Sequence, residues 1–313
     1  MKRAPLTLLV LAMALSACGG AAQEPVTLRI GVLPILDALP MYVAREQGYF
    51  AERGVTVELI PVSSAAERDQ LMQAGQIDGM INDLVSTLLY NQREVQILVV
   101  RFARVATPDF PQYRILAAAD SVITSPQDLR QVPIGISQGT VIEYVTDRLL
   151  TAEGLAPEEI TTVAVPSIAD RMSLLSSGEL EAATLPDPLS SLAIQAGARV
   201  IVDDTRHPEY GNSVYSFRRE MVEQHPQAVR GFLQAVEQAV ADINADKSRW
   251  QGLLTEQSLV PAPLVGSYEL PDFPSASIPS PDQWADVLAW AQSKGLIEAD
   301  VPYADSVTDA YLP

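Results

Sequence analysis

Residues 27–62 constrain the fold of this chain more than any other segment. Apolar residues alternate with polar or small ones over residues 26–32, and a second alternation over residues 55–59 follows after about one helix length of chain. This spacing predicts a parallel strand-helix-strand unit of nearly minimal length. The first strand-to-helix loop, residues 33–39, then lies at the carboxyl end of the sheet, where open α/β sheets bind ligands.

The motifs of this unit resemble those of a known family. The segment opens with "LRIGV", its helical part closes with "REQGYFAERG", and "VTVELIPV" follows. These motifs are similar to those of the periplasmic solute-binding proteins of ABC importers, in the group often called SsuA/THI5-like or NMT1-like, and residues 48–55 are the most specific match. The resemblance implies two lobes that close around a ligand and then dock on a membrane permease. Members of the group take nitrate, alkanesulfonates, taurine, thiamine pyrimidine precursors or flavins.

The N-terminus predicts an exported lipoprotein. A basic pair precedes a ten-residue apolar run, residues 6–15, which is too short to span a bilayer but suits a signal peptide. The sequence "LSAC" resembles a bacterial lipobox, in which Cys18 is lipidated and anchors the protein. We expect residues 1–17 to form a lipoprotein signal peptide and residues 18–25 a tether, which places the protein in the cell envelope outside the cytoplasm. An ordinary signal peptide followed by a stray cysteine is the alternative.

Composition limits the classes of function. Cys18 is the only cysteine, so once it is acylated no thiol remains for a disulfide, a nucleophile or a soft metal site. The expected mature chain of 296 residues is long enough for two domains. It carries 19 basic against 39 acidic side chains, and this charge of −20 repels phosphate backbones and argues against nucleic acid as a partner. The charge serves solubility, and attraction of cationic ligands is the alternative.

The rest of the chain continues the alternation of strands and helices. Residues 95–102 are a continuous apolar run typical of a central parallel strand, and a proline-rich loop follows them. Pro226 begins a long amphipathic helix after the chain has crossed back. We expect an α/β fold of the two-lobe, periplasmic-binding-protein-like type II, each lobe a mainly parallel sheet flanked by helices, with the ligand cleft at the hinge. Lobe 1 comprises residues 26–112 and 203–313, and lobe 2 comprises residues 113–202. No internal repeat of fixed period is apparent.

In lobe 1, polar side chains follow the predicted strands at the cleft. Asp37 lies in the first loop, where it can accept a hydrogen bond from a ligand amine or cap the next helix. Ser63 follows the second strand, beside Ser64, which is suited to be an N-cap. Asn82 and Asp83 follow the third strand, and an amide beside a carboxylate suits a polar ring system with both donors and acceptors.

In lobe 2, the turn that contains Ser137, Gly139 and Thr140 is the most informative polar element. It precedes a helix, so its free N–H groups and the helix dipole favour an anion. Simple capping of that helix by Thr140 is equally expected. Glu143, one turn further on, would oppose a phosphate or sulfonate unless it points away.

Other cleft candidates are a carboxylate and several aromatic residues. Asp187 is either a helix cap ahead of a proline or a cleft carboxylate. One or two aromatic side chains near strand ends or crossings could stack on a flat ligand. The candidates are Tyr42, Phe102, Tyr113, Tyr144 and Tyr215.

Enzymatic chemistry finds little support in the sequence. His207 and His225 are the only histidines and lack metal-ligand spacing, and neither G-x-S-x-G nor H-E-x-x-H occurs. The pyrimidine synthase that shares the fold implied by the resemblance relies on a cysteine-rich motif that this sequence lacks. We expect a monomeric binding protein without cofactor or metal, whose partners are ABC permease and ATPase subunits. A sensor subunit is the alternative.

The charged candidates give a leaning on the ligand. Asp37, Asp83 and Asp187 are cleft carboxylates, while no lysine and only Arg101 and Arg104 are expected near the cleft. A bound anion usually requires a fixed arginine or a row of N–H donors. The sequence therefore favours an aromatic heterocycle that is neutral or carries an amine, such as a thiamine pyrimidine precursor or a flavin. A sulfonate, taurine or nitrate is the alternative.

Overall fold

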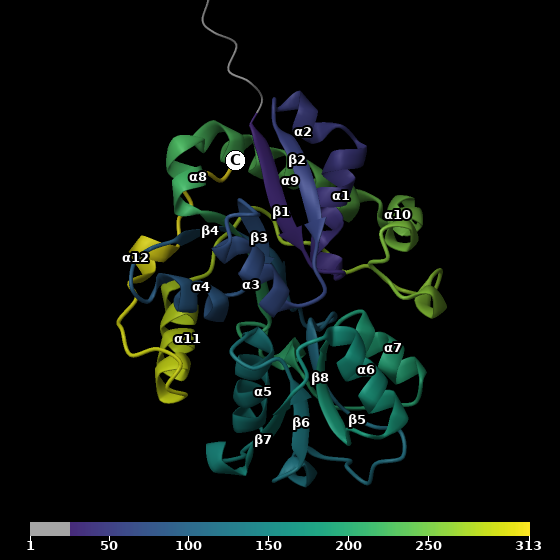
Figure 1. The fold of residues 1–313 in the computed structure, drawn as a ribbon. Helices are drawn as coiled ribbons and strands as arrows, with labels where there is room; N and C mark the ends of the chain where they lie inside the picture. The colour runs from purple at the N-terminus through teal and green to yellow at the C-terminus, as the bar shows by residue number, and fades with distance from the viewer. Residues whose placement is uncertain (1–25) are drawn as a thin grey trace, which may run out of the picture.

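A computed structural model describes residues 26–313, which form two lobes, each built on a five-stranded sheet (Figure 1). The first sheet has the order β2-β1-β3-β10-β4 and the second the order β7-β6-β8-β5-β9. The α/β fold with two sheets is therefore confirmed, although each sheet is mixed. The strands of the first sheet are β1 (Thr27–Val32), β2 (Thr56–Pro61), β3 (Gly79–Asn82), β4 (Ile97–Val105) and β10 (Asn212–Arg218), and those of the second are β5 (Tyr113–Ala117), β6 (Pro133–Ile136), β7 (Thr161–Ala164), β8 (Ala182–Pro186) and β9 (Arg199–Asp203).

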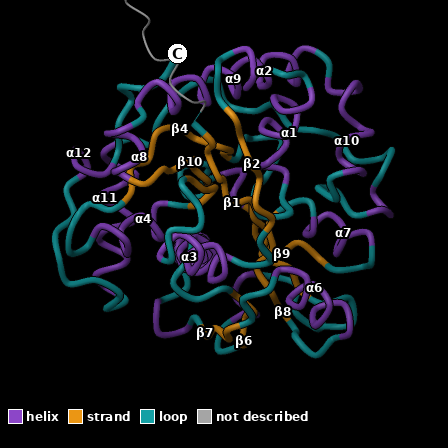
Figure 2. The backbone as a smooth tube through the Cα atoms, turned by 45° about the horizontal axis from the view of Figure 1, so that its top comes forward, coloured by secondary structure: helices purple, strands orange, loops and turns teal. Residues whose placement is uncertain are grey.

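Helices cover the faces of both sheets, and Figure 2 shows the strands in the interior with the helices around them. None of the helices in residues 26–313 is long and apolar enough to cross a membrane. The signal peptide, Cys18 and the tether lie outside the described residues. The helices are α1 (Leu39–Glu46), α2 (Tyr49–Glu52), α3 (Ala65–Gln73), α4 (Leu84–Asn91), α5 (Val141–Ala152), α6 (Ile168–Ser177), α7 (Leu189–Gln195), α8 (Arg219–Gln224), α9 (Pro226–Ala245), α10 (Gln251–Glu256), α11 (Pro281–Ser293) and α12 (Tyr303–Ser306).

The strand-helix-strand unit at the N-terminus is confirmed. Strands β1 and β2 pair in parallel, with Thr27 opposite Thr56. The loop between β1 and α1 contains a short 3₁₀ turn, Leu36–Ala38. Its position at the carboxyl end of the sheet makes it one wall of the space between the lobes.

The prediction of a central parallel strand for residues 95–102 is wrong. Strand β4 lies at the end of its sheet and pairs antiparallel with β10. It is apolar because its faces are buried and because C-terminal segments cover its outer edge. The Phe102 amide donates to the Ser277 carbonyl oxygen over 2.8 Å, and the Thr308 amide donates to that of Val99 over 3.0 Å. This covered edge cannot recruit another strand.

The two sheets repeat one arrangement of strands, which the sequence did not reveal. In the first sheet β1 lies between two parallel neighbours, β2 and β3, and the antiparallel strand β10 pairs with β3. In the second sheet β6 lies between β7 and β8 in the same way, and the antiparallel strand β5 pairs with β8. Ile30 pairs with Gly79 as Ile134 pairs with Ala182, so equivalent positions lie 104 and 103 residues apart.

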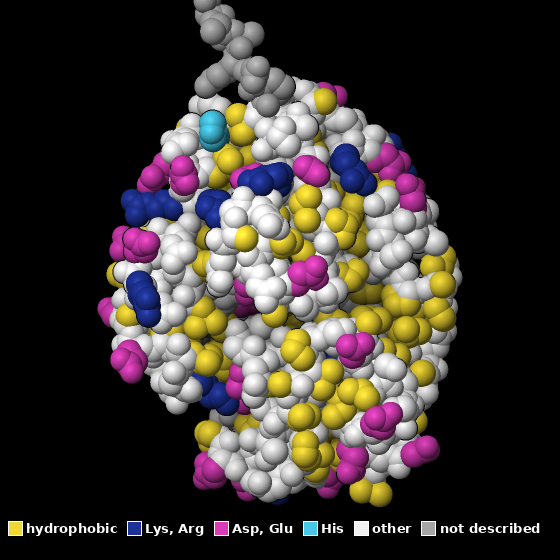
Figure 3. All heavy atoms as spheres, in the orientation of Figure 1, with side chains coloured by type: hydrophobic (Ala, Val, Ile, Leu, Met, Phe, Trp, Pro, Cys, Tyr) yellow, Lys and Arg dark blue, Asp and Glu magenta, His cyan; other side chains and the backbone are white. Residues whose placement is uncertain are grey.

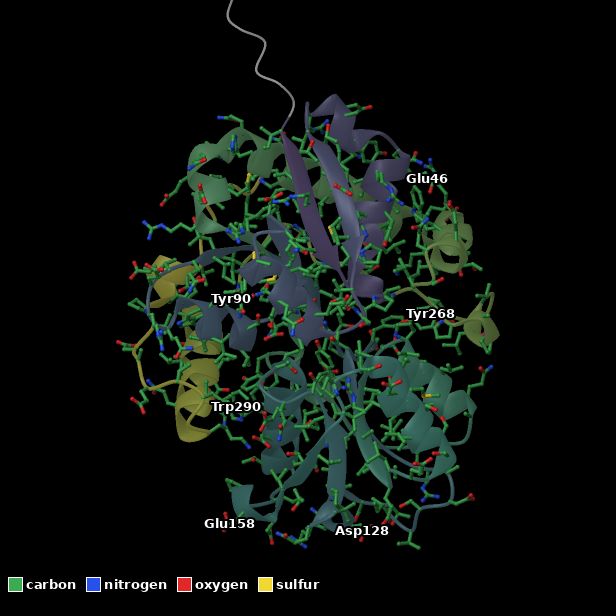
Figure 4. The ribbon with its side chains drawn as sticks, viewed as in Figure 1. Glu46, Tyr90, Asp128, Glu158, Tyr268 and Trp290 are labelled. Atoms are coloured by element: carbon green, nitrogen blue, oxygen red, sulfur yellow. The ribbon has the colours of Figure 1, made fainter. Side chains whose placement is uncertain are left out.

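Helix α11 contacts both lobes. It packs on α4 of the first lobe, and its Trp290 ring lies 5.4 Å from the Tyr144 ring of α5 in the second. The Trp290 indole N–H donates to Asp147 over 2.8 Å, and Arg148 forms a 2.8 Å ion pair with Asp286. Figure 4 shows Trp290 directed towards α5. The C-terminal segment therefore connects the lobes on the side of α5.

Candidate ligand-binding site

A cavity lies between the two lobes, where the carboxyl ends of the parallel strands of both sheets meet. It encloses about 510 Å³, including the part open to solvent. In Figure 3 the surface is hollowed between the lobes, and hydrophobic side chains gather along this furrow. The polar lining residues are Arg68, Asn82, Asp83, Tyr113, Ser137, Thr140, Arg171 and Ser213.

Two of the lobe 1 candidates, Asn82 and Asp83, line this cavity. The Asn82 amide accepts from the Ser216 hydroxyl over 2.6 Å and donates to Thr87 over 3.0 Å. One Asp83 carboxylate oxygen accepts from the Ser86 amide over 2.8 Å and so caps helix α4. Both side chains are therefore partly used by the fold before any ligand arrives.

Asp83 and Val141 line the cavity from opposite lobes. Burial raises the pKa of the Asp83 carboxyl group, while Arg68 and the backbone N–H of Val141 oppose this shift. Val141 is the first residue of helix α5 in the second lobe. The positive end of the α5 dipole therefore lies near the Asp83 carboxyl group.

In lobe 2, the turn before α5 contributes Ser137 and Thr140 to the cavity. The Thr140 hydroxyl accepts from the Ile142 amide over 3.2 Å, so this residue caps the helix as the alternative expected. Gly139 does not line the cavity, and its amide donates to Glu143 over 2.8 Å. Because Glu143 also lies 3.1 Å from Lys294, its charge is compensated away from the ligand space.

Asp37 and Asp187 do not line the cavity but belong to a buried ion cluster at the boundary between the lobes. Arg104 lies 3.9 Å from each carboxylate, and Arg114 lies 2.6 Å from Asp187. Tyr268, labelled at this level in Figure 4, donates its hydroxyl to Asp187. Asp187 does not cap α7, whose N-cap is Pro188.

The pKa values of the two aspartates differ in direction. Burial raises the pKa of Asp37, although Arg104 and the Ser213 hydroxyl oppose the shift. Burial acts on Asp187 in the same way, but Arg104 and Arg114 outweigh it and hold the pKa below its usual value. Asp37 therefore depends on Arg104 alone for a compensating cation.

A third buried carboxylate, Asp204, joins the two segments that cross between the lobes. It accepts from the amides of Gln112 at 2.9 Å and Tyr113 at 3.1 Å, and burial raises its pKa to about 7. Gln112 ends the first crossing and Asp204 begins the second. The crossings are thus held together by one side chain.

Of the remaining candidates, Tyr113 lines the cavity, whereas Tyr215, Tyr144, Tyr42 and Ser63 do not. The Tyr215 hydroxyl donates to the Asp37 carbonyl oxygen over 3.1 Å, and the Tyr144 hydroxyl donates to Asp286 over 2.6 Å. Tyr42 and Ser63 line a neighbouring depression beside residues 256–258, which shares Leu33 with the cavity. Tyr113 is the one aromatic side chain on the cavity wall among residues 26–313.

Sequence reasoning missed two arginines that line the cavity, Arg68 in α3 and Arg171 in α6. The expectation that only Arg101 and Arg104 lie near the cleft is therefore wrong. Each missed arginine lies four residues after an N-cap serine, Ser64 or Ser167. The recurrence of this Ser-x-x-x-Arg pattern 103 residues apart is the signal that could have revealed them.

The fold and the cavity define a two-lobed protein of the periplasmic-binding-protein type. The alkanesulfonate-binding protein SsuA from Xanthomonas axonopodis pv. citri, solved bound to MOPS, superposes with a TM-score of 0.77 at 20% identity, over 92% of this chain and 99% of SsuA. Residues 36–248 match the family described as NMT1/THI5 like. The match covers more than half of the chain, which therefore belongs to the NMT1/THI5-like family.

Two further proteins are similar to this chain, one in sequence and one in fold. The nitrate/nitrite binding protein NrtA of Nostoc sp. is 21% identical over 243 residues, which are 72% of this chain and 55% of NrtA. The chain thus spans about half the length of this curated relative. The desulfurization enzyme DszB shares the fold with a TM-score of 0.66 at 17% identity, over 91% of this chain and 97% of DszB. Among residues 26–313, no three His, Cys, Asp or Glu side chains are placed to hold a metal ion.

Proposed function

We propose that this protein is the extracytoplasmic solute-binding component of an ABC importer, which captures a small organic solute between its lobes and delivers it to a membrane permease. The observation that carries the proposal is a cavity whose wall comes from both lobes. A solute that contacts both walls binds the closed form more tightly than the open form and so drives closure. The names of NrtA and SsuA, both binding proteins, support this class.

The proposed partners follow from this role. The closed protein docks, as a monomer, on the permease subunits of an importer that an ATPase drives. Acyl chains on Cys18 hold it at the membrane surface, because two such chains suffice for stable anchoring. A sensor subunit would use the same cavity. Gene neighbourhood separates the two roles, since an importer component is expected beside permease and ATPase genes.

An enzymatic role is the alternative of a different class, because DszB shares the fold. The residues that line the cavity, all within the described part of the chain, include neither histidine. His207 instead stacks on Tyr210 at 5.4 Å. The cavity therefore offers charged and hydrogen-bonding groups suited to holding a solute, and binding accounts for them without a chemical step.

The residues that line the cavity change which class of solute is favoured. The sequence favoured a heterocycle because it placed three carboxylates in the cleft. Of these only Asp83 lines the cavity, and Arg68 and Arg171 face it as well. A thiamine pyrimidine precursor or a flavin remains one candidate solute. The two guanidinium groups favour the other, a solute that carries an anionic group.

Thermal unfolding of the soluble protein from Gly19 onward tests the proposal. The panel contains thiamine pyrimidines, riboflavin, taurine, other sulfonates, acetate and nitrate. A ligand at 100 times its dissociation constant adds about 2.7 kcal/mol, so we expect one class to raise the Tm by several degrees.

A matched pair of variants shows whether the shift comes from the cavity. Ala65→Trp fills the cavity, because Ala65 lines it, whereas Ala66→Trp adds the same ring to an exposed position of the same helix turn. The Tm shift should disappear in the first variant and persist in the second. A shift that persists equally in both variants would place the ligand elsewhere and contradict the proposal.

A further inference from the structure

Arg68 and Arg171 occupy equivalent places in the two lobes. Each lies beside a glycine of its central strand: a Cβ added at Gly31 would lie 3.6 Å from Arg68 Cγ, and one added at Gly135 would lie 3.3 Å from Arg171 Cγ. Gly31 and Gly135 are themselves 104 residues apart. Both arginines are buried, and both donate to a carbonyl oxygen of the next strand of the sheet. The repeat thus offers a comparison of one arginine with another in a matched setting.

Each guanidinium nitrogen of Arg68 has a hydrogen-bond partner within its own lobe. Its Nε donates to Asp69 over 2.9 Å, Nη1 to the Ile81 carbonyl oxygen over 3.1 Å and Nη2 to the Ser86 hydroxyl over 3.2 Å. Asp69 also forms an ion pair with it. All three nitrogens have partners, and the charge is balanced within the helix.

Arg171 is not satisfied in the same way. Its Nε donates to the Thr184 carbonyl oxygen over 3.0 Å and Nη1 to that of Val165 over 2.7 Å. Its Nη2 is buried and finds no hydrogen-bond partner among residues 26–313. A buried N–H group without a partner is destabilising, and more so when the group is charged.

Two differences between the lobes explain why Arg171 has neither an acceptor for Nη2 nor a balancing charge. The position of Asp69 is taken in α6 by Met172, which cannot balance the charge. The position of Ser86 is taken by Ser190, whose hydroxyl hydrogen-bonds to Asp187 and Arg114. Burial lowers the pKa of Arg171 to about 10, and no carboxylate of the described chain counteracts this. The second lobe therefore presents an uncompensated cation to the cavity.

We propose that Arg171 holds the anionic group of the solute through Nη2, and that Arg68 is structural. This inference rests on the proposed function and names the residue and the ligand chemistry of that site. A carboxylate or sulfonate oxygen supplies both the missing acceptor and the missing negative charge. The N-terminus of α5, with Ser137 and Thr140 on the same cavity wall, favours the same charge.

Met172→Asp tests the proposal by copying the first lobe into the second. The new carboxylate should pair with Arg171 as Asp69 pairs with Arg68, and compete with the solute for the guanidinium. We expect calorimetric titration with ethanesulfonate, taurine or acetate to give a dissociation constant at least tenfold weaker than that of the wild type. Met172→Asn, which has the same shape without the charge, should stay within about threefold. Thermal unfolding without ligand checks that both variants fold.

The outcomes separate this inference from the proposed function. Equal affinities of Met172→Asp and Met172→Asn for the anion would overturn the role of Arg171. Binding of riboflavin or a thiamine pyrimidine to the wild type, with no affinity for any anion of the panel, would overturn it too, while supporting a solute-binding protein. A wild type that binds nothing in the panel would count against both.

Discussion

Replacing Gly211 with alanine is expected to lower the free energy of unfolding by about 3 kcal/mol, at the upper end for added core volume. A Cβ at this position would lie 2.7 Å from Asp204 Cγ and closer still to its carboxylate oxygen. Asp204 cannot turn away without losing the hydrogen bonds that it accepts from the backbone amides of Gln112 and Tyr113. The substitution therefore either strains both crossings or releases two buried N–H groups, each costly to leave unpaired.

Urea-induced unfolding measures this loss, and the chain provides a matched control. Gly252 lies inside helix α10, and a Cβ added there meets nothing within 4 Å. Gly252→Ala should be neutral or stabilise by roughly 0.5–1 kcal/mol, because alanine favours the helix. If Gly211→Ala unfolds at the same urea concentration as Gly252→Ala, the packing of Asp204 against the second crossing is not as described.

Arg104→Met is expected to cost about 3–5 kcal/mol, the usual penalty for removing one partner of a buried ion pair. Arg104 is buried between Asp37 and Asp187, and its Nη1 donates to the Asp187 carbonyl oxygen over 3.4 Å. Asp187 retains Arg114, whereas Asp37 is left without a cation. The loss should therefore come mainly from Asp37.

A double-mutant cycle separates that contribution. Adding Asp37→Asn to Arg104→Met removes the stranded charge, so the double variant should unfold at a higher denaturant concentration than Arg104→Met alone. Arg219→Met is the exposed control, because its ion pair with Glu223 lies on the surface, and it should change stability by no more than about 0.5 kcal/mol. A double variant less stable than Arg104→Met would show that Asp37 depends on other groups.

Hydrophobic periodicity and cap residues predicted most of the fold. The helix expected to begin at Pro226 is α9, and the helix expected after Thr140 is α5. Both helix predictions succeeded because the face that is apolar in the sequence is also the face that the fold buries. The same reasoning gave a wrong prediction for strand β4, because an apolar run indicates that a strand is buried but not which chain segment covers it. Its covering segments lie about 170 to 210 residues away in sequence.

The site was predictable only in part. Residues that end a strand or directly follow one, such as Asn82, Asp83 and Ser137, reach the cavity because strand ends define its position. Arg68 and Arg171 were missed because an arginine inside an amphipathic helix is ordinarily assigned to the surface. Tyr144 and Tyr215 were misplaced because an aromatic residue near a strand end packs as readily into the core. The internal repeat was the missing information.

The central claim, closure of two lobes around a solute, is tested most directly by a distance between the lobes. Ala66 and Ala169 are exposed, occupy equivalent first turns of α3 and α6, and lie next to the lining residues Ala65 and Ile168. With Cys18 absent from the soluble protein, spin labels attach only to Ala66→Cys and Ala169→Cys. In pulsed electron paramagnetic resonance, the distances between the two labels should become shorter when the panel compound that raises the Tm is added. An unchanged distribution with that compound would contradict the account.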